Sequence, residues 1–295
     1  MHKFMRAIGF SQFNNVKDQQ KLITDIIVNA PTRSYTSLND NVIIASFSRE
    51  FAPGVGITVV GKFDEDDQFT YSYYYPYVEA LCISSEEDIS VDRHAADDSY
   101  AGVVDDNRMG VSIIFYLQNM IPYIKAVRTD MLPMTGTTLS LAALSDSGTI
   151  LMPLMKTVKD VVTNQQILKS RSKLISAAKA GDDSAMEDLT LKDMDTYSNI
   201  AERIHEEDVF TLVDTYFMPY GVECDQYAIL GEITALTELV NTVSKEELYK
   251  MTILCNDIEM ELCVNKKDVY GQPAVGRRYK GTIWLQGHIN YPMSP

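Results

Sequence analysis

Two ranges of this chain, about 170 residues apart, carry the same short motifs in the same order, and this repetition constrains the fold most strongly. A Phe-x-Pro motif followed by Gly-Val occurs at 51–55 and again, with one extra residue, at 217–222. Further matches follow collinearly, and the last aligns the apolar run 110–119 with 281–290. The offsets lie between 166 and 173 residues. Collinear matches of this kind indicate a duplicated β-rich module.

Both ranges are rich in β-branched and aromatic residues bounded by glycine, proline or acidic turns, which is the signature of strands. The predicted strands are residues 42–51, 57–63, 69–81, 89–93 and 111–117 in the first range, and 209–217, 227–233, 248–256, 258–265 and 279–289 in the second. Residues 139–154 are predicted as a buried hairpin with its turn at 145–148. Short loops in the second range favour a small, partly closed barrel, for which an oligonucleotide-binding barrel is one candidate.

Helical signals precede the first range and separate it from the second. Residues 15–30 place apolar side chains on one face, with Asn15 as N-cap and Pro31 as a stop. Residues 156–206 also keep helical spacing, in a basic arm followed by an acidic arm, so we expect an antiparallel helical hairpin. A capping box at 184–187 begins the second arm. The remaining connections are a predicted loop at 32–40 and a connector at 120–136 that holds Pro122 and Pro133.

These patterns predict an α+β fold of two β-rich, partly closed, barrel-like modules of common descent, joined by a helical hairpin. The expected divisions are residues 1–155 for the N-terminal helix and first module, 156–208 for the helical connector and 209–295 for the second module.

Charge and cysteine usage narrow the class of protein. The chain has 295 residues and a net charge of −15, which repels nucleic acid and anionic membranes at long range. Its four cysteines contain no CxxC pair, as is typical of free thiols in a reducing compartment. No apolar run is long enough for a signal peptide or a membrane span. We therefore expect a cytoplasmic protein without a membrane partner.

A basic cluster in the second range is the first candidate ligand site. It consists of Lys266, Lys267, Arg277, Arg278 and Lys280, with Tyr279 and Trp284 nearby. Positive charge beside aromatic rings is the pattern of single-strand nucleic-acid binders and of phosphate sites. The alternative is that these side chains pair with carboxylates of the first module and dock the two modules together.

A tyrosine-rich strand in the first range is the second candidate surface. Strand alternation places Tyr71, Tyr73, Tyr75 and Tyr77 on one face. Such a face suits an interface, either between the modules or between the subunits of a homodimer, and a stacking platform is the alternative.

No arrangement of residues indicates catalysis or metal binding. Cys224 would need His94, His205 or His288 beside it to act as a hydrolase nucleophile, and the sequence supplies no such pairing. The acidic turns at 64–67, 86–88, 97–98 and 105–106 lack EF-hand spacing, and the histidines lack zinc-site spacing. We therefore predict no catalytic residue, no metal and no cofactor.

Three long strings resemble a family of uncharacterised bacterial proteins best represented in anaerobic clostridia. They are residues 1–11 (MHKFMRAIGFS), 216–226 (YFMPYGVECDQ) and 275–287 (VGRRYKGTIWLQG). The resemblance implies no activity, because that family is known only as a domain of unknown function. The expectation is thus a non-enzymatic interaction or scaffold protein. The alternatives are binding of nucleic acid or a phosphate ligand by the second module, and a hydrolase that uses Cys224.

Overall fold

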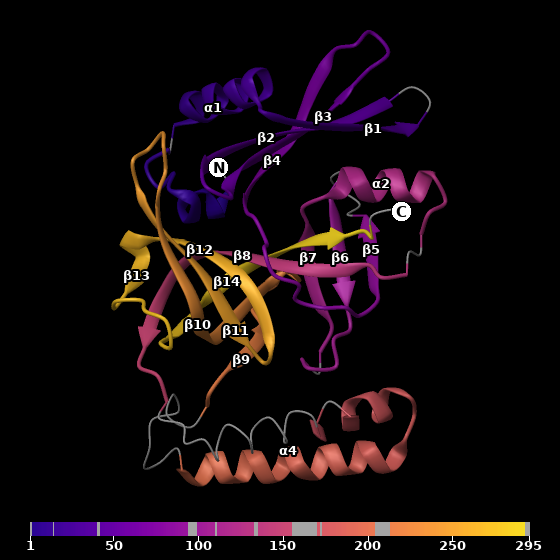
Figure 1. The fold of residues 1–295 in the computed structure, drawn as a ribbon, viewed down its shortest axis with the longest axis vertical. Coiled ribbons are helices and arrows are strands. Elements are labelled where there is room, and N and C mark those ends of the chain that lie inside the picture. Colours follow the sequence, from indigo (N-terminus) through magenta and orange to yellow (C-terminus); the bar gives the residue numbers. More distant parts are fainter. Residues whose placement is uncertain are drawn as a thin grey trace.

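The structure is a computed structural model that describes residues 2–13, 15–39, 42–93, 99–109, 111–132, 135–154, 170–171, 173–203 and 213–292. Two sheets dominate it: a four-stranded sheet in the first part of the chain and a ten-stranded sheet that contains a closed five-stranded barrel (Figure 1). Helices α1 and α2 lie against the smaller sheet, and α4 lies below the barrel (Figure 1).

The four-stranded sheet is an antiparallel meander of β1 (Thr32–Asn39), β2 (Val42–Ala52), β3 (Val55–Phe63) and β4 (Phe69–Val78). Helix α1 (Val16–Asn29) packs on β2 and β3 through the buried Leu22 and Ile26. Its N-cap is Asn15, as predicted, because the Asn15 side chain accepts a hydrogen bond from the Lys17 N–H at 3.0 Å.

The outer part of the larger sheet is a second meander, in the order β5 (Ile89–Arg93), β6 (Tyr100–Val104) and β7 (Ile113–Leu117). Helix α2 (Met120–Arg128) follows and contacts β1 and β2. The predicted connector at 120–136 therefore contains a helix in its first half that the sequence did not indicate. Pro122 suggested a break, but it lies in the first turn of α2, where a missing N–H costs no intrahelical bond.

The barrel consists of β8 (Thr138–Leu151), β10 (Gln226–Val240), β11 (Glu247–Cys255), β12 (Ile258–Asn265) and β14 (Arg278–Asn290). Strands β10, β11 and β12 form an antiparallel meander, β14 pairs antiparallel with β10, and β8 pairs parallel with β12 and antiparallel with β14. Two short strands add to this ring, β9 (Tyr216–Pro219) on β10 and β13 (Val269–Tyr270) on β8. Strand β14 also pairs in parallel with β7, which joins the barrel to the outer meander.

The cyclic strand order matches that of the five-stranded oligonucleotide-binding barrel, with its strands in a permuted sequence order. In that barrel a meander is followed by a strand antiparallel to its first strand, and then by a strand parallel to its third. Here β14 and β8 take those places, and β8 comes first in the sequence instead of last. The long β10 pairs with β14 through its first half and with β11 through its second.

Strand β8 overturns the predicted hairpin at 139–154, because it runs through the expected turn as one strand. Ser145 and Gly148 suggested a turn, but both serve packing. Ser145 Oγ donates to the Thr282 carbonyl at 2.6 Å, beside a β-bulge at which Asp146 and Ser147 of β8 oppose the single residue Thr282 of β14. A Cβ on Gly148 would lie 2.3 Å from the Tyr279 ring, so the glycine is required by a close approach.

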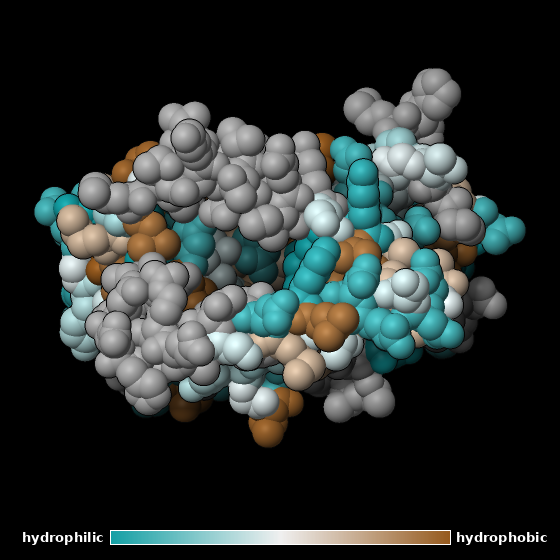
Figure 2. Space-filling model, turned by 90° about the horizontal axis from the view of Figure 1, so that it is seen from below, coloured by the Kyte–Doolittle hydropathy of each residue, from teal (hydrophilic) through white to brown (hydrophobic). Residues whose placement is uncertain are grey.

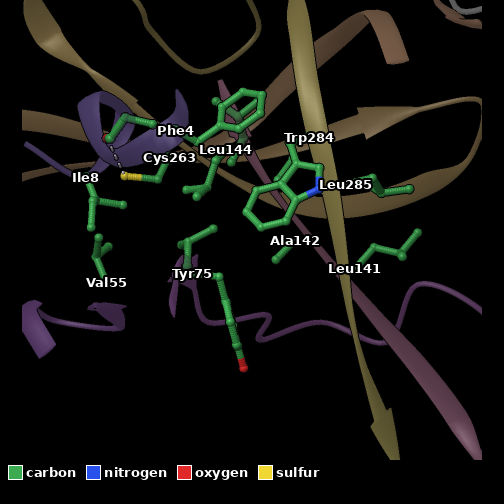
Figure 3. Close-up of a cluster of buried hydrophobic side chains, with 14 of the residues drawn as sticks. Phe4, Ile8, Val55, Tyr75, Leu141, Ala142, Leu144, Cys263, Trp284 and Leu285 are labelled. Atoms are coloured by element: carbon green, nitrogen blue, oxygen red, sulfur yellow. Dashed lines mark hydrogen bonds between the residues drawn. The ribbon is translucent and has the colours of Figure 1, made fainter. Parts of the chain in front are cut away.

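The N-terminal 3₁₀ helix η1 (Lys3–Ile8) fills the space between the two sheets. It contacts β4, β8 and β12. Figure 3 shows Ile8 of η1 near Val55 of the smaller sheet and Cys263 of the barrel, and Phe4 of η1 near Trp284 of the barrel. The rings of Phe4 and Trp284 stack at 5.5 Å, and Cys263 Sγ donates to the Ala7 carbonyl at 3.4 Å. One continuous core therefore joins both sheets.

Helix α4 (Asp183–Arg203) follows helical residues 173–179 in the range predicted as a hairpin. Arg171 and Asp193 form an ion pair at 2.5 Å, of the kind that the opposite charges of the two arms predict. Asp182, rather than the predicted Ser184, accepts hydrogen bonds from the first N–H groups. Residues 155–169 and 204–212 lie outside the described part. Seen from below, the described surface is mainly hydrophilic, with scattered hydrophobic residues (Figure 2).

Two further expectations differ from the structure. Residues 32–39, predicted as a loop from their Ser, Thr and Asn content, form β1, since pairing with β2 satisfies their backbone. The predicted duplication is not confirmed, because strand order differs between the two ranges. Strands β5, β6 and β7 are neighbours in sequence order, whereas their supposed counterparts β12, β13 and β14 are each paired with β8.

Candidate functional site

A groove of about 990 Å³ opens beside β5, the outermost strand of the larger sheet. We call it the edge groove. Four separate segments of the chain line it: the approach to β5 and β5 itself, helix α2, the segment before β8, and the end of β14. Its lining residues are Glu86, Glu87, Asp88, Ile89, Val91, Tyr123, Leu132, Thr135, Gly136, Thr137, Thr138, Ile289 and Tyr291.

One wall of the edge groove is acidic. Glu86, Glu87 and Asp88 are consecutive, exposed side chains on the segment that leads into β5. Ser85, immediately before them, pairs with Leu139 of β8 in an isolated antiparallel bridge. Because this bridge holds the start of the segment, the three acidic side chains are kept at the groove.

An ion pair between the buried Asp106 and the exposed Arg108 fixes the same segment from behind. Asp106 is almost fully buried, and its carboxylate accepts hydrogen bonds from Arg108 at 2.6 and 2.9 Å and from Ser85 Oγ at 2.7 Å. Burial alone would raise the pKa of Asp106, but these donors lower it below its ordinary value. Arg108 also donates to the carbonyls of Ser84 and Asp257. A neighbouring cavity of about 640 Å³ lies beside Arg108 and shares Glu86 and Glu87 with the edge groove.

Two tyrosines line the groove as well. Tyr123 Oη donates to the Val91 carbonyl of β5 at 3.4 Å. Tyr291 Oη is buried and has no hydrogen-bond partner within the described ranges. Burial raises the pKa of Tyr291 to about 12, so its hydroxyl stays protonated at neutral pH and can both donate and accept.

The remaining lining combines apolar side chains with backbone. Ile89, Val91, Leu132 and Ile289 supply aliphatic surface. Strand β5 pairs with β6 on one side only, so its outer edge faces the groove without a strand partner among the described residues. The groove therefore combines an aliphatic lining and hydrogen-bond acceptors with excess negative charge at one end.

The structure does not bring the predicted basic cluster together on one exposed surface. Lys266 pairs with Glu238 at 2.9 Å and Glu247 at 3.4 Å, and Lys267 lies 3.6 Å from Glu246. These carboxylates belong to the barrel itself, not to the first part of the chain.

The remaining members of that cluster, at the start of β14 and just before it, are engaged in packing and local contacts. Arg278 is buried and donates to the carbonyls of Met152 and Val213. Arg277 donates to the Gln272 carbonyl, and Lys280 is half-buried. Tyr279 lies fully inside the barrel and donates to Ser145 Oγ at 2.8 Å.

The outer face of β11 and β12, where an oligonucleotide-binding barrel holds its ligand, is covered by other parts of this chain. Helix η1 lies against one end of this face. There Cys263 Sγ donates to the Ala7 carbonyl, and the Asn265 side chain donates to the Arg6 carbonyl at 3.3 Å. At the other end, Ser84 Oγ donates to the Glu259 carbonyl at 2.6 Å. The face also carries the acidic side chains Glu259 and Glu261, which oppose an anionic ligand.

The predicted tyrosine face of β4, with Tyr71, Tyr73, Tyr75 and Tyr77, lies largely at the contact between the two sheets. Tyr75 is buried and donates to the Gln118 carbonyl at 2.8 Å, and its ring lies 4.8 Å from that of Tyr116. Tyr73 Oη contacts Met120 Sδ at 3.3 Å. Tyr77 is half-buried, and only Tyr71, which is 41% exposed, projects from the sheet.

Cys224 is exposed, and partial burial together with Asp225 raises its pKa, which disfavours the reactive thiolate. His94 and His205 lie outside the described residues, as do the acidic residues 97–98. Within the described part of the chain, no three His, Cys, Asp or Glu side chains are grouped to hold a metal ion.

Of the edge groove, the sequence indicates only the acidic residues 86–88, which it predicts as a solvated turn. The hydroxyl of Tyr291 gave no signal, because its burial depends on packing near the last strand. The segment 135–138 reads as part of a connector. Only the acidic run directly before a predicted strand marked the place.

Comparison with known proteins gives a family and no function. A family model with the description "Domain of unknown function, E. rectale Gene description (DUF3881)" matches residues 5–287. This confirms the resemblance that the sequence predicts. No curated protein matches, and no solved structure matches. Among the described residues, no helix is long and apolar enough to cross a membrane.

Proposed function

The chain belongs to this family of unknown function, DUF3881, and since its description assigns no activity, we propose from the edge groove that it is a non-enzymatic interaction protein. Its ligand is an aliphatic chain that bears ammonium groups. Such a chain is found both in the lysine side chains of a partner protein and in a free polyamine.

The buried hydroxyl of Tyr291 carries this proposal. A buried polar group without a partner costs about 1–3 kcal/mol, and native proteins keep few of them. Tyr291 lines the groove and its hydroxyl has almost no exposed surface, so a donor or acceptor in the groove satisfies this hydroxyl if the tyrosine ring turns toward it.

The charge and polarity of the groove support an ammonium group as that donor. Glu86, Glu87 and Asp88 attract positive charge, and the threonine and tyrosine oxygens accept hydrogen bonds. Aromatic rings also attract ammonium groups through the cation–π interaction. The aliphatic side chains of Ile89, Val91, Leu132 and Ile289 suit the methylene portion of the ligand.

Isothermal titration calorimetry at low ionic strength tests the proposal with spermidine and with tetralysine. We expect saturable binding of at least one probe, weakened about 10-fold or more when Glu86, Glu87 and Asp88 are replaced by Gln, Gln and Asn. Tighter binding of tetralysine indicates a protein partner, and tighter binding of spermidine indicates a polyamine.

A matched control separates the groove from the general acidity of the chain. Glu65→Gln with Asp66→Asn and Asp67→Asn removes the same charge from the exposed turn between β3 and β4. This control should bind as the wild type does. An equal loss of affinity in the groove variant and the control variant, or no binding of either probe by the wild type, contradicts the proposal.

Binding of a nucleic acid or another phosphate ligand by the barrel is the second candidate, and the cyclic strand order alone favours it. The covered outer face of β11 and β12 and the burial of Tyr279 count against it. A fluorescence titration with short single-stranded DNA at low salt tests it, because electrostatic binding is strongest there.

A further inference from the structure

The smaller sheet has one covered edge and one open edge. Its β4 edge lies against η1, β8 and β12. Its β1 edge pairs with β2 along nearly its whole length and has no strand partner on the other side among the described residues. At eight residues, β1 is long enough to offer several free backbone donors and acceptors.

Strand β1 has a β-bulge at Leu38, near its end, but the stretch from Thr32 to Ser37 lacks the features that usually protect an open edge. In natural proteins, the edge strands of sheets are kept from pairing with other chains by lysines, prolines, inward-pointing charges or bulges, or by being short. The charged residue of β1 is Arg33, and its guanidinium is directed back at α1, where it donates to the carbonyls of Val28 and Ala30. Arg128 of α2 caps the far end by donating to the Ser37 carbonyl. The stretch before Ser37 stays open.

Exposed apolar side chains surround this open stretch. Tyr35 in the middle of β1 is 73% exposed. Val28, whose carbonyl binds Arg33, is 61% exposed, and Val127, next to Arg128, is 49% exposed. Ile43 of β2, the partner of Ser37, is 38% exposed. Both helices that flank the edge thus present apolar surface beside it.

The local charge permits a second copy to approach here. Residues 16–39 and 120–130 hold five basic side chains, Lys17, Lys21, Arg33, Lys125 and Arg128, against three acidic ones, Asp18, Asp25 and Asp130. The edge region therefore has a net charge of +2, although the whole chain carries −15. Repulsion between two copies is accordingly weaker at this edge than over the acidic remainder of the surface.

We propose that β1 pairs antiparallel with β1 of a second copy across a two-fold axis, so that two four-stranded sheets become one. An antiparallel strand pair is self-complementary, because each backbone donor on one copy meets an acceptor on the other. Such a contact is isologous and closes after two copies. The α1 end of each β1 then lies beside the α2 end of the other copy's β1. The edge groove takes no part in this contact.

Sedimentation equilibrium across micromolar concentrations tests the pairing. The wild type should sediment with twice the mass of the chain, and Tyr35→Lys should raise the dissociation constant about 10-fold or more. Tyr71→Lys, at the exposed tyrosine of β4, is the matched control and should leave the dimer intact. A wild type that stays monomeric, or a dimer that Tyr35→Lys leaves unchanged, overturns the proposal.

Disulfide trapping gives a second readout that does not depend on weakening the contact. Single cysteines at Ser34, Tyr35, Thr36 and Ser37 are introduced in a Cys224→Ser background, which removes the exposed native thiol. A two-fold antiparallel pair brings only the residue at the axis, or its immediate neighbours, close enough to its own counterpart for a disulfide. We expect one maximum along the series. Equal cross-linking at all four positions, or at none, contradicts the pairing.

Discussion

Two tyrosines of the same part of the chain have opposite hydrogen-bonding environments. Tyr279 is fully buried in the barrel, and its hydroxyl donates to Ser145 Oγ. Tyr291 has a buried hydroxyl without a partner in the described part of the chain, at the wall of the edge groove. The first hydroxyl is part of the folded core. The second has no such bond, which costs stability in the free protein, and we propose that it meets a ligand.

This contrast predicts opposite effects for the same substitution. Tyr291→Phe removes an unsatisfied hydroxyl, so the free energy of unfolding should rise or stay unchanged, by up to about 1 kcal/mol. Tyr279→Phe removes a hydrogen bond to Ser145 and should lower the free energy of unfolding by about 1 kcal/mol. Urea denaturation followed by circular dichroism measures both. Marked destabilisation by Tyr291→Phe would show that its hydroxyl is already satisfied in the free protein.

At the scale of elements, most strands could be predicted because their period of two and their bounding turns are local properties of the sequence. Strand β5 and the whole β10–β12 meander were placed within a few residues, apart from the long second half of β10. Strand β8 could not, because its Ser-Asp-Ser-Gly segment has turn chemistry. Only pairing on both sides, with β14 and with β12, keeps it extended.

The continuity of β8 can be tested at Gly148. In a hairpin turn an added methyl group would be tolerated or only mildly strained. In β8 it collides with the buried ring of Tyr279, so Gly148→Ala should lower the free energy of unfolding by about 1–3 kcal/mol. The exposed neighbour substitution Ser147→Ala serves as the control and should change it by less than about 0.5 kcal/mol. A tolerated Gly148→Ala in thermal and urea unfolding would contradict this register.

At the scale of the whole molecule, sequence order and spatial order diverge. The strand that closes the barrel precedes the helical range, while the strands it joins follow it. The edge groove shows the same property, since residues 86–91, Tyr123, 135–138 and Tyr291 converge only after both sheets have formed. The sequence predicts the acidic turn and the strand beside it. The groove depends on long-range pairing and could not be predicted from either.

Ammonium binding in the edge groove is tested most directly by methyl NMR of Ile-, Leu- and Val-labelled protein during titration with tetralysine and with spermidine. Ile89, Val91, Leu132 and Ile289 supply methyl probes on the lining of the edge groove. Binding in the groove should produce saturable shifts at these methyls, and none at Leu248, Leu254 or Ile258 of the β11–β12 hairpin. Shifts centred on that hairpin, or spread evenly over the surface without saturation, would contradict it.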